Sequence, residues 1–226
     1  MTADIAKYID HTLLNPQATR ADIIKLCEEA KEHNFFAVCV NPYWVRLAVK
    51  ELSSSNVAVA TVVGFPLGAN LGDLKIAEAQ RAISEGAEEI DMVINIGALK
   101  DGDVNSVEEE IRAIVKVAKE RIVKVIIETD LLTEDEKVAA TKACVKAGAG
   151  MVKTSTGFVK DGKGATVEDI KLIKETLAGA PLGIKASGGI RDVEKAKSLI
   201  EAGATRLGTS SGVSLVKGLQ PAAAAY

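Results

Sequence analysis

Three helix-like segments of this chain end in the same Gly-Ala pair, and a strand-like apolar segment follows each pair at once. The pairs begin at Gly86, Gly148 and Gly203. Glycine supplies the left-handed residue that commonly ends a helix. The repeat therefore predicts several copies of one helix–turn–strand unit. Such copies favour a fold of alternating strands and helices around a parallel sheet.

Helical and strand-like patterns alternate from one end of the chain to the other. The expected strands, the first of them weak, are Tyr8–Leu13, Phe36–Val40, Val57–Val63, Glu89–Asn95, Val123–Glu128, a segment around Lys153, Leu182–Ala186 and Thr205–Gly208. Eight is the number of parallel strands that closes a barrel. No linker or composition break divides the chain. We expect one domain over residues 1–226, an α/β (β/α)8 TIM barrel with a short N-terminal extension and a mobile C-terminal tail.

Composition narrows the classes of function. Hydrophobic residues make up 47% and aromatic residues only 4% of the 226 residues, so the core must be aliphatic. The net charge is −3, and without a basic stripe we expect no nucleic-acid partner. No apolar run reaches the ~18 residues of a membrane span. Three widely spaced cysteines, Cys27, Cys39 and Cys144, indicate a reducing cytoplasm. With two histidines and no clustered thiols, we expect no metal site and no cofactor.

The repeat also predicts which side chains point into the barrel. Counting five residues past each glycine reaches Asp91, Lys153 and Gly208. Because each of these residues lies five positions after an equivalent turn, we expect the three residues to lie at the same height in the barrel and to face the same way. Strand side chains alternate between faces, and the neighbours of Asp91 and Lys153 are mostly apolar, which suits the helix layer. We therefore place Asp91 and Lys153 inside.

Two lysines then fall on neighbouring strands. Lys185 lies at the centre of the strand after that of Lys153, and adjacent strands lie ~4.8 Å apart. Burial and a nearby like charge both disfavour a charged amine, and a neutral amine attacks carbonyl carbons. We expect one lysine to be neutral and nucleophilic, and the other to be charged and paired with Asp91. Two alternatives stay open: Lys153 caps its strand in solvent, or the three groups are an ion cluster that only fills the barrel.

Glycine-rich and hydroxyl-rich turns follow the last strands, where barrels often hold a phosphate group. The candidate substrate-binding residues in these turns are Thr156, Gly157, Gly188, Gly189, Arg191, Ser210 and Ser211. Backbone N–H groups of glycines can approach an anion closely, and serine hydroxyls add donors. The same dipeptides also mark ordinary turns.

Further single residues have two interpretations each. Asp10 and Thr12 line the mouth, or Asp10 caps an element. Cys39 contacts substrate, or it is a small core hydrophobe. Glu128 is catalytic, or it supports a lysine by a hydrogen bond. Asp130 faces solvent or caps the next helix.

Seven motifs resemble those of the deoxyribose-phosphate aldolase family and cover essentially the whole chain. They are Ile9-Asp10-His11-Thr12-Leu13-Leu14, Val63-Gly64-Phe65-Pro66-Leu67-Gly68, Glu89-Ile90-Asp91-Met92-Val93, Val125-Ile126-Ile127-Glu128-Thr129, Val152-Lys153-Thr154-Ser155-Thr156-Gly157-Phe158, Lys185-Ala186-Ser187-Gly188-Gly189-Ile190-Arg191 and Gly208-Thr209-Ser210-Ser211-Gly212. Asp130 departs from the family pattern, and so do the alanines before Tyr226.

The resemblance implies a metal-independent class I aldolase of deoxyribose phosphate catabolism. Such an enzyme reversibly cleaves 2-deoxy-D-ribose 5-phosphate to D-glyceraldehyde 3-phosphate and acetaldehyde. By motif, Lys153 resembles the Schiff-base lysine, Lys185 the lysine that lowers its pKa, and Asp91 the carboxylate of the proton relay. A homodimer is expected. The competing hypotheses are a transaldolase-like lyase for another phosphosugar, and a non-catalytic phosphosugar-binding protein.

Overall fold

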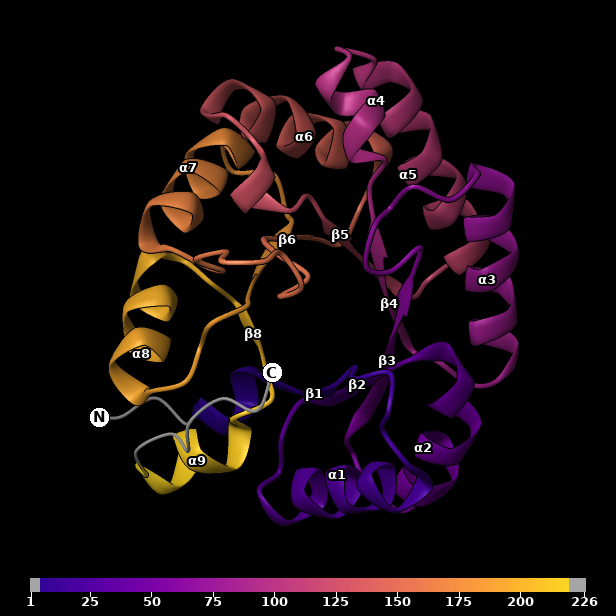
Figure 1. Ribbon diagram of the computed structural model, residues 1–226, viewed down its shortest axis with the longest axis vertical. Coiled ribbons are helices and arrows are strands. Elements are labelled where there is room, and N and C mark those ends of the chain that lie inside the picture. The colour runs from indigo at the N-terminus through magenta and orange to yellow at the C-terminus, as the bar shows by residue number, and fades with distance from the viewer. Residues whose placement is uncertain (1–4, 220–226) are drawn as a thin grey trace.

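The computed structural model describes residues 5–219, and its centre is a closed barrel of eight parallel strands (Figure 1). Each strand pairs with the next one in the chain, and β8 pairs with β1. The strands are β1 (Ile9–Leu13), β2 (Ala37–Val40), β3 (Ala58–Val63), β4 (Glu89–Val93), β5 (Ile122–Ile126), β6 (Met151–Lys153), β7 (Gly183–Ser187) and β8 (Arg206–Thr209). The predicted (β/α)8 barrel is confirmed.

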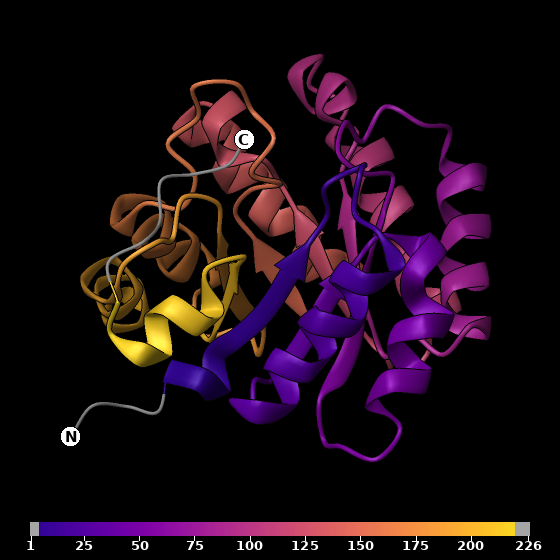
Figure 2. The ribbon, with the colours of Figure 1, turned by 60° about the horizontal axis from the view of Figure 1, so that its bottom comes forward.

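Helices form a ring around the barrel in Figure 1 and cover its outer face. They are α1 (Arg20–Glu32), α2 (Val45–Leu52), α3 (Gly72–Ser84), α4 (Ile96–Lys100), α5 (Val104–Ala118), α6 (Glu134–Ala147), α7 (Val167–Leu177), α8 (Val193–Ala202) and α9 (Gly212–Lys217), with 3-10 turns η1 (Ile5–Tyr8), η2 (Pro42–Trp44) and η3 (Thr129–Leu131). Figure 2 shows the β1 arrow rising toward the end of the barrel where the loop after β6 lies.

The repeated glycines end their helices as the sequence predicts. The φ angles of Gly86, Gly148 and Gly203 are +105°, +78° and +126°, in the region that favours glycine. Helix starts are equally local in origin. Thr19 and Thr133 each accept a hydrogen bond from the backbone three residues on, in a capping box that fixes the first turns of α1 and α6.

Two predicted strands end two residues earlier than expected, and each ends where a polar group turns the chain. The strand expected over Glu89–Asn95 ends at Val93, because the Asn95 side chain accepts a hydrogen bond from Ala98 N and caps α4. The strand expected to reach Glu128 ends at Ile126, and Glu128 itself has φ +60°. The predicted N-terminal extension and C-terminal tail fall mainly on residues 1–4 and 220–226, outside the described residues.

Apolar burial occurs in two places. The main core lies between the strands and the helices, and it is aliphatic as predicted. A small second cluster of Leu14, Cys39, Ala60 and Val62 lies apart from it. Cys39 and Ala60 are register partners on β2 and β3, so this cluster fills one side of the barrel interior. The other side of the interior is therefore left to charged side chains.

Candidate active site

A cavity of about 600 Å³ opens at the carboxyl ends of the strands, the end at which barrel enzymes bind their substrates. Lys153 is part of its lining, and the turns after β6, β7 and β8 form its walls. Of the substrate-binding residues predicted from the sequence, the cavity is lined by Thr12, Thr156, Gly157, Gly188, Gly189, Arg191, Ser210 and Ser211.

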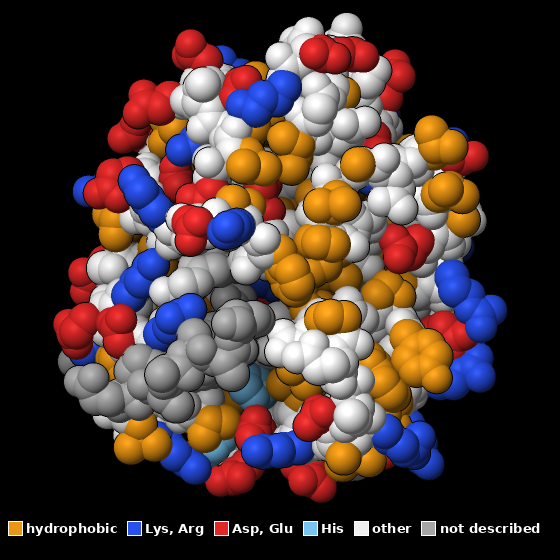
Figure 3. All heavy atoms as spheres, in the orientation of Figure 1, with side chains coloured by type: hydrophobic (Ala, Val, Ile, Leu, Met, Phe, Trp, Pro, Cys, Tyr) orange, Lys and Arg blue, Asp and Glu red, His pale blue; other side chains and the backbone are white. Residues whose placement is uncertain are grey.

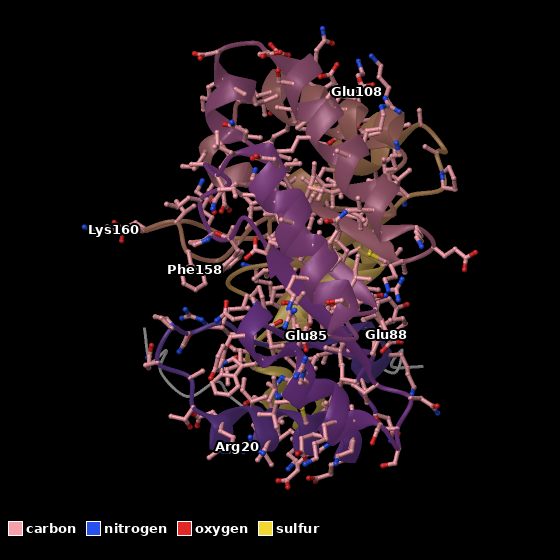
Figure 4. All side chains as sticks on the ribbon, turned by 90° about the vertical axis from the view of Figure 1, so that its right-hand side faces the viewer. Arg20, Glu85, Glu88, Glu108, Phe158 and Lys160 are labelled. Carbon is pink, nitrogen blue, oxygen red and sulfur yellow. The ribbon has the colours of Figure 1, made fainter. Side chains whose placement is uncertain are left out.

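The rim of the mouth is apolar on one side. Figure 3 shows apolar side chains gathered across the middle of this face. Phe158 is 42% exposed and packs edge-on against Phe65, with ring centroids 5.1 Å apart. Figure 4 shows Phe158 and Lys160 projecting from the loop after β6. The mouth thus has an aromatic edge as well as a glycine-rich and hydroxyl-rich wall.

Lys153 is the last residue of β6, and its side chain is almost entirely buried. Its Nζ donates to Asp91 Oδ2 at 2.7 Å. Burial lowers the pKa of Lys153 below the ordinary lysine value; the attraction of Asp91 opposes this, and the charge of Lys185 adds to it. A buried amine of lowered pKa at the base of an open cavity can act as a nucleophile toward carbonyl carbons.

Lys185 is the register partner of Lys153 on β7, so the two lysines lie on adjacent strands. Its Nζ donates to the same Asp91 oxygen at 2.8 Å and also to Asp10 Oδ2. Burial alone would lower the pKa of Lys185, but Asp10 and Asp91 outweigh it and the net shift is upward. The surroundings therefore shift the pKa values of the two lysines in opposite directions, downward for Lys153 and upward for Lys185.

Asp91 contacts three lysines, because Lys124 also donates to its second oxygen at 2.8 Å. The sequence-based expectation of a single charged lysine partner is therefore wrong. Burial alone would raise the pKa of Asp91, but Lys124, Lys153 and Lys185 together lower it well below the ordinary value. The three lysines around Asp91 thus favour its ionised form.

Sequence reasoning missed Lys124, Glu89 and Arg206, which continue the charged cluster toward the other end of the barrel. Lys124 Nζ lies 2.6 Å from Glu89 Oε2, and Arg206 Nη1 lies 3.0 Å from the same oxygen. A signal for Lys124 was present, since it is a lone lysine inside the apolar run Ile122–Ile126, as Lys185 is inside its own strand.

Asp10 lies inside the barrel, which corrects the expectation that it lines the mouth or caps an element. It is fully buried and contacts Lys124, Lys185 and Arg206. An unpaired buried carboxylate is costly, and Asp10 can lie there because the three cations compensate its charge. Cys39 is also fully buried, with the apolar interior cluster as its neighbours, and it is absent from the cavity lining.

Glu128 holds the turn after β6 and makes no ion pair with a lysine among residues 5–219. Its carboxylate accepts hydrogen bonds from the backbone N and the Oγ1 of Thr156. Burial raises the pKa of Glu128. The expected support for a lysine is thus replaced by support for Thr156, whose N–H and hydroxyl both face Glu128 rather than the cavity.

Asp130 does more than face solvent, and it does not cap α6, because the cap of that helix is Thr133. Its two carboxylate oxygens accept from the backbone N–H groups of Lys163 at 3.0 Å and Gly164 at 2.9 Å. Asp130 therefore holds the far end of the β6–α7 loop.

The turns after β7 and β8 present free backbone donors. Gly188 and Gly189 have φ of +86° and +67°, which their missing side chains permit. Within residues 5–219, no acceptor takes a hydrogen bond from the N–H groups of Gly188, Gly189 or Ser210. Such a group of N–H donors is suited to bind an anion such as a phosphate.

A barrel with a buried lysine of lowered pKa beneath a mouth of free N–H donors is suited to the class of enzymes that act on carbonyl compounds through a lysine amine. Among the described residues, no cluster of three metal-ligating side chains occurs. No helix within that same part of the chain is long and apolar enough to cross a membrane.

Comparison with known proteins identifies the family. A model of DeoC/LacD family aldolases matches residues 5–217, so the chain belongs to this family. A deoxyribose-phosphate aldolase of Geobacillus sp. (strain WCH70) is 58% identical over 219 residues, which are 96% of this chain and 97% of that protein. One from Thermococcus gammatolerans is 56% identical over 223 residues, 97% of this chain and 98% of the relative.

Solved structures agree with the sequence relatives. The crystal structure of a protein described as a putative deoxyribose-phosphate aldolase from Coccidioides immitis has a TM-score of 0.92 and 44% identity, covering 95% of this chain and 85% of that one. The deoxyribose phosphate aldolase of Aeropyrum pernix, described as a unique tetramer, has a TM-score of 0.89 and 32% identity, covering 96% and 92%.

Proposed function

We propose that this protein reversibly cleaves 2-deoxy-D-ribose 5-phosphate to D-glyceraldehyde 3-phosphate and acetaldehyde through a Schiff base on Lys153. The observation that carries the proposal is a buried amine of lowered pKa, in contact with Asp91 and Lys185, in the lining of a mouth with free N–H donors. The relatives named deoxyribose-phosphate aldolase supply the substrate.

The reaction begins when the neutral Lys153 amine attacks the aldehyde carbon of the open-chain sugar and water leaves. The resulting iminium withdraws electrons from the adjacent carbon. Loss of the C3 hydroxyl proton then breaks the C2–C3 bond, releases glyceraldehyde 3-phosphate and leaves an enamine on Lys153. Protonation of the enamine at C2 and hydrolysis release acetaldehyde and return the free amine.

A water molecule held by Asp91 and Lys185 carries the protons in this sequence. The fixed charges of the two groups orient this water, because the anion accepts a hydrogen bond from it and the cation donates one. The phosphate binds at the Gly188–Gly189 turn and Ser210, with Arg191 and Ser211 beside them. Binding there fixes the far end of the sugar and positions the reacting carbon.

Reductive trapping tests the central step. Incubation with acetaldehyde and borohydride should leave an N-ethyl group on Lys153, found by peptide mass spectrometry. Lys153→Leu should abolish both the adduct and turnover, while Lys116→Ala, at an exposed position on α5, should change neither. An adduct confined to another lysine would contradict the assignment.

The Lys185→Leu variant tests whether Lys185 takes part in the reaction or only fills the barrel. Without the Lys185 charge, the pKa of Lys153 should rise, and turnover near neutral pH should fall by about two orders of magnitude. Full activity in the folded variant would show that Lys185 takes no part in the reaction.

Product analysis distinguishes the proposed enzyme from a transaldolase-like lyase, because only the proposed enzyme makes deoxyribose 5-phosphate with acetaldehyde as the donor.

We propose further that the protein is a cytoplasmic homodimer. Leu67 and Leu71 are about 70% exposed, and Tyr43 is 83% exposed, which leaves apolar area for a second copy. All three cysteines are buried free thiols, in keeping with a reducing compartment. Light scattering after size-exclusion chromatography tests the dimer, with a monomer mass as the contrary result. Cell fractionation tests the location.

A further inference from the structure

An unbroken series of ion pairs joins Lys153, at the mouth, to Arg206, at the start of β8. Lys153 contacts Asp91, and Asp91 contacts Lys124 at 2.8 Å. Lys124 contacts Glu89, and Arg206 Nη1 lies 3.0 Å from Glu89. Arg206 is 3% exposed and its guanidinium lies over the ring of Phe36, 3.4 Å from the centroid. The series therefore runs through the barrel interior from its carboxyl end to its amino end.

The interior holds unequal numbers of the two charges. Within residues 5–219, the ion pairs of this network join three carboxylates and four cations: Asp10, Glu89 and Asp91 with Lys124, Lys153, Lys185 and Arg206. All seven side chains are buried. An uncompensated charge in such an interior is unfavourable. One cation therefore has a strong tendency to lose its proton.

The remaining inward groups do not correct this inequality. β2 presents Cys39, and burial raises the pKa of that thiol, so it is neutral near pH 7. β3 presents Ala60 and Val62, which carry no charge. Glu128 is near enough to Lys153 to be influenced by its charge, but its carboxylate bonds Thr156 and forms no ion pair within the described chain.

The four cations differ in the number of carboxylates that they contact. Lys153 contacts one carboxylate, whereas Lys185 and Arg206 contact two each and Lys124 contacts three. Arginine does not deprotonate in proteins. Lys153 is thus the cation with the fewest partners, and it is also the one that lines the cavity.

We propose that Glu89 and Arg206, which line no part of the mouth, set the protonation state of Lys153 by fixing the number of charges in the barrel. They act as positioning residues. Arg206 supplies the fourth cation, so the interior holds one more cation than carboxylates and Lys153 tends to lose its proton. Glu89 supplies the third carboxylate, which limits the excess to a single positive charge. This inference rests on the proposed role of Lys153 as the Schiff-base amine.

Three variants test it: Glu89→Gln, Arg206→Met and the double variant. A unit charge about 10 Å away, at an effective dielectric constant of about 20, shifts a pKa by about one unit. Arg206→Met should raise the pKa of Lys153 and move the acid limb of its reactivity about one pH unit upward. Glu89→Gln should move it downward. The double variant, with two carboxylates and three cations, should return to the wild-type position.

The measurement is the rate at which acetaldehyde and cyanoborohydride alkylate Lys153 at each pH, read by peptide mass, with the acid limb of kcat/KM in parallel. A purely structural role would lower rates without moving the limb. If Arg206→Met does not accumulate as folded protein by circular dichroism, the single Glu89→Gln and the double variant still differ by the Arg206 charge alone, and their limbs should differ by about one unit.

The inference would be overturned if the acid limbs of the single variants and the double variant lay at the same pH. It would also be overturned if the limb of the double variant lay at the pH of a single variant instead of that of the wild type. Failure of the proposed function looks different. In that case the wild-type protein itself carries no label on Lys153, whatever the pH.

Discussion

At Gly208 the missing side chain makes room for a reactive group. A Cβ built there would lie 3.0 Å from Cε of Lys185 and 3.0 Å from Cβ of Ser187. Gly208 does not have a positive φ, so its backbone would accept another residue. Its glycine is therefore explained by packing against Lys185, which agrees with the inward facing that the repeat of helix-ending glycines predicts.

Gly208→Ala tests this packing. The added methyl should displace the Lys185 amine by a few tenths of an ångström, reduce kcat about tenfold and cost about 1–2 kcal/mol of stability, as overpacking does. Steady-state kinetics and urea unfolding measure the two effects. Gly72→Ala is the matched control, because its Cβ would meet nothing nearer than 3.9 Å. An unchanged kcat in Gly208→Ala would show that the Lys185 side chain tolerates the added methyl group without losing its catalytic position.

At the scale of an element, the loop between β6 and α7 is held at both ends by carboxylates from the turn after β5. Glu128 bonds Thr156 at the start of the loop, and Asp130 bonds Lys163 and Gly164 near its end. Between these points lies Phe158, at the aromatic edge of the mouth. The loop beside the site is thus fixed at both ends by carboxylates from a neighbouring strand's turn.

Asp130→Ala should release the far end of this loop and leave the barrel intact. Losing two hydrogen bonds to a carboxylate in a half-exposed loop should raise KM for the phosphorylated substrate about three- to tenfold, with little change in the unfolding midpoint. Hydrogen exchange should accelerate at the amides of residues 163 and 164 alone. Thr133→Ala, which removes the cap of α6, should change stability but not KM.

Periodicity and glycine spacing were sufficient to predict the barrel, its strand order and the facing of Asp91 and Lys153. They predicted less where a group's partner lies far away in sequence. Asp10 and Arg206 are 196 residues apart, and no local pattern shows that they meet. Asp130 was misjudged for the same reason, since its partners lie 33 and 34 residues further on. Lys124 could have been found, because it breaks an apolar strand as Lys185 does.

Across the whole molecule, the charged interior makes stability depend on pH. Burial alone would raise the pKa values of Asp10 and Asp91, but the surrounding cations outweigh burial and lower both. A carboxyl with a lowered folded-state pKa stabilises the fold at pH values above its unfolded pKa, near 3.8. This stabilisation is lost as pH falls, because only the unfolded chain then binds the proton. The barrel should therefore be sensitive to acid.

Below about pH 4, these two groups should reduce the free energy of unfolding by about 2.7 kcal/mol per pH unit, about 1.4 from each proton. Urea unfolding, followed through the single tryptophan, Trp44, measures the slope. The double variant Asp91→Asn with Lys124→Met removes one carboxylate and one cation, so the interior keeps its surplus of one cation. Its slope should be smaller by about 1.4 kcal/mol per pH unit. An identical slope in the two proteins would mean that acid acts on the surface carboxylates, and that the interior of the barrel does not set its acid stability.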